Sequence, residues 1–184
     1  AINLLEAMRQ RGQDAPAVRA LLAHACLRFH RYDETVRLCR ELLASDPEHV
    51  EINRVEVSRL LGWAYHHLGN GERDAGRLDA ALKWHKQAYT VWEELLHRFP
   101  DSPADLNGLG ETLLAVGLLL EKQGRHREAL DIYLQSVACS RRAYEFIPAE
   151  FAPGRMLTFG LMKVADAQMG LRLDQEALAT LEQL

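Results

Sequence analysis

The sequence has no long hydrophobic run, no strong excess of charge of either sign and few cysteines. Its longest apolar run is about Leu113–Leu120, whereas a helix needs roughly 20 apolar residues to span a bilayer. The formal net charge is −4 and no basic stretch stands against it, so neither nucleic acid nor a membrane is an expected partner. These absences leave a protein of ordinary composition, whose 184 residues suffice for one domain or several stacked repeats.

The three cysteines, Cys26, Cys39 and Cys139, have no spacing that is typical of a metal site. Each falls inside a helical pattern, which favours buried, reduced thiols in a cytoplasmic protein. Cys26 and Cys39 occupy facing positions of one predicted hairpin, so we expect them to come close.

No catalytic motif is complete. Gly71–Gly76 imitates a phosphate-binding loop, but Arg77 and Leu78 stand where that loop needs lysine and a hydroxyl residue. Gly108-Leu-Gly110 lacks the third glycine and the strand of a dinucleotide site, which favours close helix packing instead.

The histidines also fit no familiar catalytic or metal motif. His66 and His67 are adjacent, so on a helix they point about 100° apart and cannot easily share a metal. A metal site that joins His66 to His24 of a neighbouring helix is the weaker alternative. We therefore predict no enzyme activity, no metal and no cofactor.

What the sequence does contain is a repeat. Gly76–Pro100 returns as Gly124–Pro148, displaced by 48 positions. The identical positions lie at turns and at helical spacing. A fixed period in this range is typical of a solenoid, in which each unit buries its apolar face against its neighbours.

Pro16–Pro47 resembles a tetratricopeptide repeat, a helix-turn-helix unit of about 34 residues. Its matching residues are Leu22, Ala23, Ala25 and Tyr32. It departs from the repeat at His30, where glycine is usual, and at Thr35 and Leu42, where alanine is usual. The run Leu61-Gly62-Trp63-Ala64-Tyr65 matches the first helix of a second unit, and Gly117, Gly124 and Ala129 match a third. The resemblance implies an all-α, right-handed α-solenoid of antiparallel helix pairs.

The resemblance also divides the chain. Residues 1–15 are predicted to be the trailing helix of a truncated repeat, and residues 16–47 the first repeat. Residues 48–100 and 101–148 follow as two extended repeats, and residues 149–184 as a partial fourth. Because the chain lacks an initiator Met and stops within a helical pattern, we expect a fragment of a larger protein.

The long period predicts long helices. Pro103–Gln123 and Arg125–Phe146 each run about 21 residues, which adds about two turns to the usual repeat helix. A helical apolar stripe continues through the second unit, made of Ala81, Trp84, Ala88, Trp92, Leu95 and Phe99. Long-helix arrays of this kind resemble those appended to bacterial multidomain Ser/Thr kinases.

In the second unit, Gly69 is predicted to end the first helix with a left-handed residue. The extra residues Asn70–Gly76 then form either a longer loop or an N-terminal extension of the second helix.

In the family, the first helices line a concave groove, and the matching positions predict the partner-binding residues. These are His24, Arg28, Arg59, Trp63, His66, His67, Glu111, Leu114, Leu118 and Glu121. The register in the fourth unit points to Gly160, Val164, Ala167 and Gln168. Trp63, with histidines and an arginine nearby, has the make-up of a binding hot spot, and the alternative is a tryptophan packed on the neighbouring repeat.

The resemblance therefore favours a non-catalytic scaffold that binds a peptide or protein partner in the concave groove. Two alternatives stay open. The array could be a self-assembly or spacer module whose terminal faces, Ile2/Leu5 and Leu178/Leu181, stack into homo-oligomers. It could also be a regulatory or sensor region that controls an attached catalytic domain such as a kinase.

Overall fold

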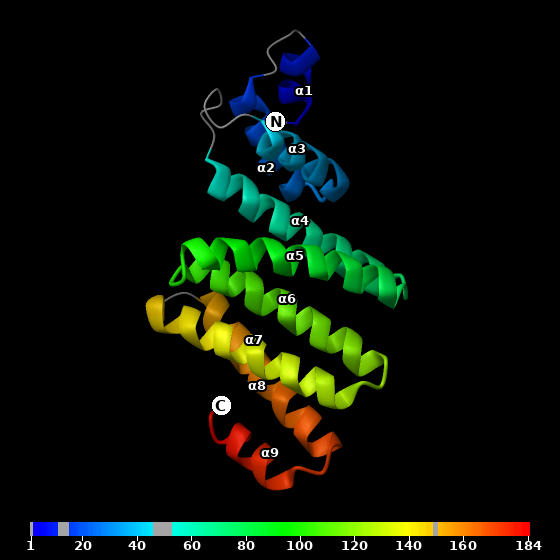
Figure 1. Cartoon of the computed structure of the whole chain (residues 1–184), viewed down its shortest axis with the longest axis vertical. Coiled ribbons are helices and arrows are strands. Elements are labelled where there is room, and N and C mark those ends of the chain that lie inside the picture. The colour runs from blue at the N-terminus through cyan, green and yellow to red at the C-terminus, as the bar shows by residue number, and fades with distance from the viewer. Residues whose placement is uncertain (1, 11–14, 46–52, 149–150) are drawn as a thin grey trace.

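The protein is a stack of α-helices. The structure, a computed structural model, describes residues 2–10, 15–45, 53–148 and 151–184, and within these ranges it contains helices and no strand. The helices are α1 (Ile2–Gln10), α2 (Pro16–Arg28), α3 (Tyr32–Ala44), α4 (Arg54–Asp74), α5 (Leu78–Arg98), α6 (Pro103–Lys122), α7 (His126–Phe146), α8 (Phe151–Gly170) and α9 (Asp174–Leu181). Figure 1 shows consecutive helices running back and forth across the long axis of the stack, with α1 and α9 at opposite ends. The predicted all-α solenoid is confirmed.

The four hairpins α2/α3, α4/α5, α6/α7 and α8/α9 have the same type of turn. Each turn contains one residue with a left-handed backbone: His30 (φ 61°), Gly76 (φ 77°), Gly124 (φ 76°) and Arg172 (φ 59°). The next N–H donates at 2.9 Å to the carbonyl five residues before it, in Arg31 to Cys26, Arg77 to Glu72, Arg125 to Leu120 and Leu173 to Gln168. This bond closes the end of the first helix in a Schellman arrangement.

The turn between α4 and α5 shows that the prediction for Gly69 and Asn70–Gly76 was wrong. Helix α4 continues through Gly69 to Asp74, and Gly76 takes the left-handed conformation. The extra residues therefore lengthen the first helix of the hairpin, and they form neither a loop nor a part of α5. Gly69 serves close packing instead, because a Cβ added there would lie 2.6 Å from Nε2 of His85.

The helix lengths agree with the predicted extension. Helices α2 and α3 have 13 residues each, whereas α6 has 20 and α7 has 21. Helices α4 and α5 also have 21 residues each. In the α5 stripe, Ala81, Ala88, Trp92 and Leu95 are buried and Trp84 is half-buried, but Phe99 at the end of the helix is exposed.

Glycines let large rings fill the space between helices. A Cβ on Gly62 of α4 or on Gly108 of α6 would lie 2.7 Å from the ring of buried Trp92. A Cβ on Gly117 of α6 would lie 2.3 Å from the ring of Tyr133 on α7. The sequence interpretation of Gly108 as a close-packing residue is therefore confirmed.

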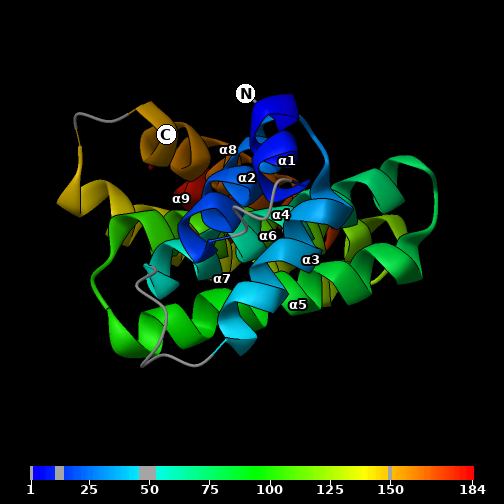
Figure 2. The ribbon, with the colours of Figure 1, turned by 90° about the horizontal axis from the view of Figure 1, so that it is seen from above.

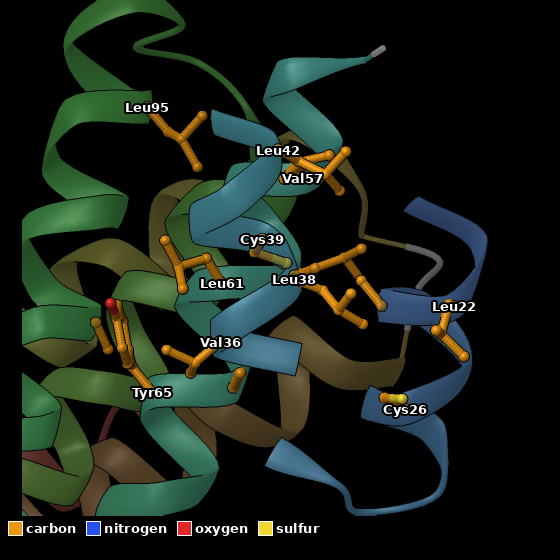
Figure 3. Packing of buried hydrophobic residues seen from close by; sticks show 14 of the residues in the cluster. Leu22, Cys26, Val36, Leu38, Cys39, Leu42, Val57, Leu61, Tyr65 and Leu95 are labelled. Atoms are coloured by element: carbon orange, nitrogen blue, oxygen red, sulfur yellow. The ribbon is translucent and has the colours of Figure 1, made fainter. Parts of the chain in front are cut away.

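The first half of the stack has a continuous apolar core. Figure 3 shows side chains of α2, α3, α4 and α5 meeting there, among them Leu22, Leu38, Leu61 and Leu95. Cys26 and Cys39 belong to the same core and are free thiols whose pKa values are raised by burial, to about 11 and about 12. The predicted burial of these two cysteines as reduced thiols matches the structure.

The even-numbered helices form an inner layer. Helix α2 contacts α4, α4 contacts α6, and α6 contacts α8. Across the described ranges, no odd-numbered helix contacts the next odd-numbered helix. Figure 2 looks along the stack and shows α3, α5 and α7 to one side of α2, α4 and α6. A surface shared by several hairpins is therefore built by the even helices.

A buried ion pair joins two of these inner helices. Nε of Arg59 on α4 donates to Oδ1 of Asp105 at 2.7 Å, and its NH2 group donates to Oδ2 at 3.0 Å. The same NH2 group donates at 3.2 Å to Oγ of Ser102, whose side chain caps α6. The Asp105 side chain is fully shielded from solvent. Arg59 therefore acts in the contact between two repeats.

The glycine packing yields a paired stability prediction. Gly117→Ala should lower the free energy of unfolding by about 1–3 kcal/mol, because the added methyl group overpacks the Tyr133 contact. Gly71 of α4 has no atom within 4 Å of an added Cβ, so Gly71→Ala should raise it by about 0.5–1 kcal/mol. Urea unfolding of both variants measures the difference, and equal effects would contradict the close contact.

The buried ion pair yields a second prediction. Arg59→Leu should cost about 3–5 kcal/mol, because it leaves a buried carboxylate without its cation. Changing Asp105 to leucine in the same protein should recover most of that loss, since an apolar pair can replace a buried ion pair.

Arg77→Leu is the control for the ion-pair variants, because its bond to Glu72 is exposed and should contribute less than about 1 kcal/mol. A single Arg59 variant as stable as the double variant would show that the pair does not hold α4 to α6.

Candidate functional site

An open cavity of about 340 Å³ lies between the inner helices α4, α6 and α8. Three consecutive hairpins each contribute one wall. The lining residues are His66, Asn70 and Arg73 of α4, Glu111, Leu114, Ala115 and Leu118 of α6, and Arg155, Met156 and Phe159 of α8.

The apolar part of the cavity comes from α6 and α8. Leu114 and Met156 are buried, whereas Leu118 is half-buried and Phe159 is 41% exposed. Apolar surface therefore extends from the interior of the cavity to its rim. An apolar group of a ligand could exchange water for contact with these side chains.

His66 is held neutral within a chain of hydrogen bonds. Its Nε2 lies 2.9 Å from Nδ2 of Asn70, and its Nδ1 lies 3.4 Å from Oγ1 of Thr112. Thr112 in turn donates to the carbonyl of Gly108 at 2.8 Å. Burial, with smaller contributions from His85, His67 and Arg73, lowers the pKa of His66 to about 3.

A second buried histidine stands behind the cavity wall. The ring centroids of His66 and His85 are 5.3 Å apart, with an edge-to-face geometry. Burial lowers the pKa of His85 to about 4. Neutral rings suit this contact, because two imidazolium ions at this distance would repel each other without water to screen them.

Charged groups surround the apolar surface. Burial raises the pKa of Glu111, while a bond from Asn107 and the charge of Arg155 act in the opposite direction. Nδ2 of Asn107 donates to Oε1 of Glu111 at 3.1 Å. Arg73 is paired with the neighbouring Asp74 at 2.9 Å. The cavity thus combines an apolar surface with polar groups from all three helices.

Four of the predicted groove residues line this cavity: His66, Glu111, Leu114 and Leu118. Sequence reasoning did not select the remaining six lining residues. Asn70 and Arg73 lie beyond Gly69, where the first helix was predicted to end. The longer α4 carries the same helical face onward to them.

The α8 wall also differs from the prediction. Gly160 and Val164 are buried in the structure, and buried Gln168 accepts a bond from Thr180 of α9 at 2.8 Å. Because α8 is apolar around much of its circumference, the spacing of its apolar residues does not distinguish the open face from the buried one. Phe159 could have been identified only as a large apolar residue opposite the buried face.

The remaining predicted residues lie elsewhere on the inner helices. Trp63 is half-buried and meets Trp92 edge to face, with ring centroids 5.3 Å apart. His67 stacks on Tyr32 at 4.8 Å. Arg59 is bound to Asp105, as described above. These three side chains pack within the array.

The other three predicted residues also lie outside the cavity lining. His24 and Arg28 are exposed on α2. Glu121 accepts a hydrogen bond from the hydroxyl of Tyr133 at 2.6 Å and lies 3.5 Å from Nζ of Lys163. None of these three residues lines the cavity.

The described residues contain no group of three or more His, Cys, Asp or Glu side chains that could hold a metal ion. None of the helices in those ranges is both long enough and apolar enough to cross a membrane.

Comparison with known proteins identifies the repeat. The family model described as "Tetratricopeptide repeat" matches residues 60–142. A solved structure of MamA from AMB-1 is similar with 18% identity and a TM-score of 0.37, over 91% of this chain and 88% of that chain. No curated protein gives a match.

The family match covers α5, α6 and most of α4 and α7, the helices with the clearest 48-residue period. Tetratricopeptide repeats generally mediate protein–protein interaction and are typically non-catalytic. The resemblance to arrays appended to kinases stays a prediction, because no comparison tests it. Residues 60–142 therefore match the tetratricopeptide repeat family.

Proposed function

We propose that the inner face formed by α4, α6 and α8 binds a segment of a partner protein and that the cavity receives its anchor residue. The supporting observation is that three successive inner helices together line one open cavity with partly exposed apolar side chains. A small number of deeply buried side chains carries most of the affinity of a typical protein interface.

The size of the cavity favours an anchor over a whole folded surface. A volume of about 340 Å³ lies near the lower end of the range for ligand pockets, and it accommodates one large side chain with little space left over. The rest of the partner segment would then run along the inner helices. Arg73 and Arg155 border the same cavity and would face the polar part of that segment.

A second candidate function is self-association through the exposed leucines of α9 and the residue that follows it. Leu178, Leu181 and Leu184 are 60%, 43% and 54% exposed. Leu181 lies nine residues after Arg172, the left-handed turn residue of its hairpin. The residues at the same position in the earlier hairpins, Cys39, His85 and Tyr133, are completely buried.

In each of the three earlier hairpins, the second helix is covered by the first helix of the next hairpin. The exposed face of α9 therefore corresponds to surfaces that another helix covers in the earlier hairpins. We propose a second copy of this chain as its occupant, because the uncovered leucines would lose contact with water in a dimer.

Partner binding is testable with a peptide library displayed on phage and the wild-type protein as bait. Selected peptides should bind Leu118→Glu more than about thirtyfold more weakly, a loss of about 2 kcal/mol that is typical of a hot spot. The physical reason is that a carboxylate would replace apolar surface inside the cavity. Fluorescence anisotropy with a labelled peptide measures the two affinities.

Leu134→Glu is the matched control, because Leu134 is exposed on α7 and does not line the cavity. It should leave peptide affinity unchanged, and circular dichroism checks that both variants fold. Peptides that bind both variants equally well would place the binding surface elsewhere.

The oligomeric state tests the second candidate. Light scattering across a concentration series should show a wild-type dimer that Leu181→Glu converts to monomer, because the new charge would be buried in the contact. Leu134→Glu should dimerise like the wild type. A wild-type protein that is monomeric at the highest concentration, or a dimer that Leu181→Glu leaves intact, would exclude this contact.

A further inference from the structure

Two buried histidines pack against each other where α4 meets α5. His85 of α5 is completely buried, and neither of its ring nitrogens has a hydrogen-bond partner among the described residues. Its ring lies against the α4 backbone, because a Cβ added to Gly69 would lie 2.6 Å from Nε2. His66 of α4 meets the same ring edge to face, with centroids 5.3 Å apart. An imidazolium ion at either position would be a charge removed from water.

The next hairpin repeats this arrangement but carries the opposite charge beside it. Tyr133 lies nine residues after its turn glycine, as His85 does, and its ring packs against Gly117 in the same way. Glu121, three residues before the turn glycine, accepts the Tyr133 hydroxyl at 2.6 Å. The residue at the position of Glu121 in the α4/α5 hairpin is Arg73. A site that could hold a counter-ion for an imidazolium thus holds a second cation.

Burial and Arg73 both oppose protonation of the histidine pair. Burial is the main cause that lowers the pKa of His66 to about 3 and that of His85 to about 4. The charge of Arg73 acts in the same direction on both rings, and His67 adds a smaller effect on His66.

Helices α6 and α8 give His66 no carboxylate partner among its described contacts. The α6 group that touches His66 is the neutral hydroxyl of Thr112, 3.4 Å from Nδ1. Glu111 is the one carboxyl group among the described lining residues of the cavity. It accepts a hydrogen bond from Asn107 and lies in the field of Arg155 of α8.

The contact of α4 with α5 and α6 therefore depends on pH. A histidine in water takes up a proton at a pKa of about 6.5, whereas both rings of the closed stack stay neutral down to about pH 4. The closed form binds fewer protons than an opened form, so its stability falls as the pH drops from about 6.5 toward 4. At about pH 5, the equilibrium constant for opening rises about thirtyfold for each histidine that becomes exposed.

We infer that the contact of α4 with α5 and α6 is an acid-sensitive switch, in which protonation of His66 and His85 separates these helices and removes the α4 wall of the cavity. Because each unit of a solenoid contacts only its neighbours, loss of one contact opens the array at that place. The opening does not depend on what the cavity binds, whereas release of a partner segment in acid rests on the proposed function.

NMR of the wild-type protein tests the state of the two rings. The imidazole signals of His66 and His85 should stay those of neutral rings from about pH 7.5 to about pH 5 while the stack is closed. A ring that takes up its proton near pH 6.5 in the closed stack would overturn the inference, because closed and opened forms would then bind equal numbers of protons.

His85→Leu tests the contribution of one ring and introduces the residue that the α8/α9 hairpin has at this position. Urea unfolding at about pH 7.5 and about pH 5 gives the rise of the unfolding constant in acid, and this rise should be about thirtyfold smaller in the variant. His97→Leu is the matched control, because His97 is an exposed histidine of the same helix, and it should keep the wild-type rise. Equal rises in the wild type and His85→Leu would overturn the inference.

Reversal of the charge at Arg73 tests the electrostatic part of the switch. Arg73→Glu should make the rise in acid about tenfold smaller, because a nearby carboxylate favours the charged form of a histidine. An unchanged rise would contradict the effect assigned to Arg73.

Tryptophan emission locates the opening, because all three tryptophans, Trp63, Trp84 and Trp92, lie on α4 and α5. During an acid titration of the wild type, the emission maximum should move to longer wavelength at a higher pH than the loss of helix seen by far-UV circular dichroism. Coincident transitions would show that the whole stack unfolds at once and would overturn the local switch. This experiment and the NMR titration decide the question even where a variant does not fold.

A peptide selected by phage display separates the switch from the proposed function. A peptide that Leu118→Glu weakens should move the emission change to lower pH, because it binds only the closed form. If it leaves that change in place, the cavity survives the opening and the inferred release is wrong. If no selected peptide depends on Leu118, the proposed function fails, and the NMR, urea and emission results still decide the switch.

Discussion

The close approach of helices at glycine positions is the constraint on which this structure depends. A Cβ at Gly62 or Gly108 would collide with the ring of Trp92, and one at Gly117 would collide with Tyr133. Because those rings fill the space that the glycines leave, neighbouring helices can lie close together at these positions. The long hairpins are thereby held as one continuous stack.

That packing also creates the inner surface. The even helices contact one another, whereas the odd helices in the described ranges do not. The bond between Arg59 and Asp105 joins two inner helices near the start of α6. The cavity opens farther along the same helices, where His66, Thr112 and Gly108 form the hydrogen-bonded side of the α4–α6 contact. The groups that hold the inner layer together thus also shape and polarise the cavity.

Burial accounts for the state of the titratable groups at this site. It lowers the pKa of His66 and His85 and raises that of Glu111, because a charged form loses water in each case. A neutral His66 can accept from Asn70 and donate to Thr112 at the same time. The chemistry of the wall therefore follows from helix packing.

By itself the sequence determined the helical class, the 48-residue period and the lengthened helices, because all three are written in local spacing. The resemblance to the repeat family also selected His66, Glu111, Leu114 and Leu118 for one surface. The sequence could not show whether Gly69 is a turn or a packing residue, or which face of α8 is open. Only the tertiary structure decided these points, because both depend on side chains that other helices bring: His85 packs against Gly69, and α9 covers one side of α8 while Phe159 turns toward the cavity.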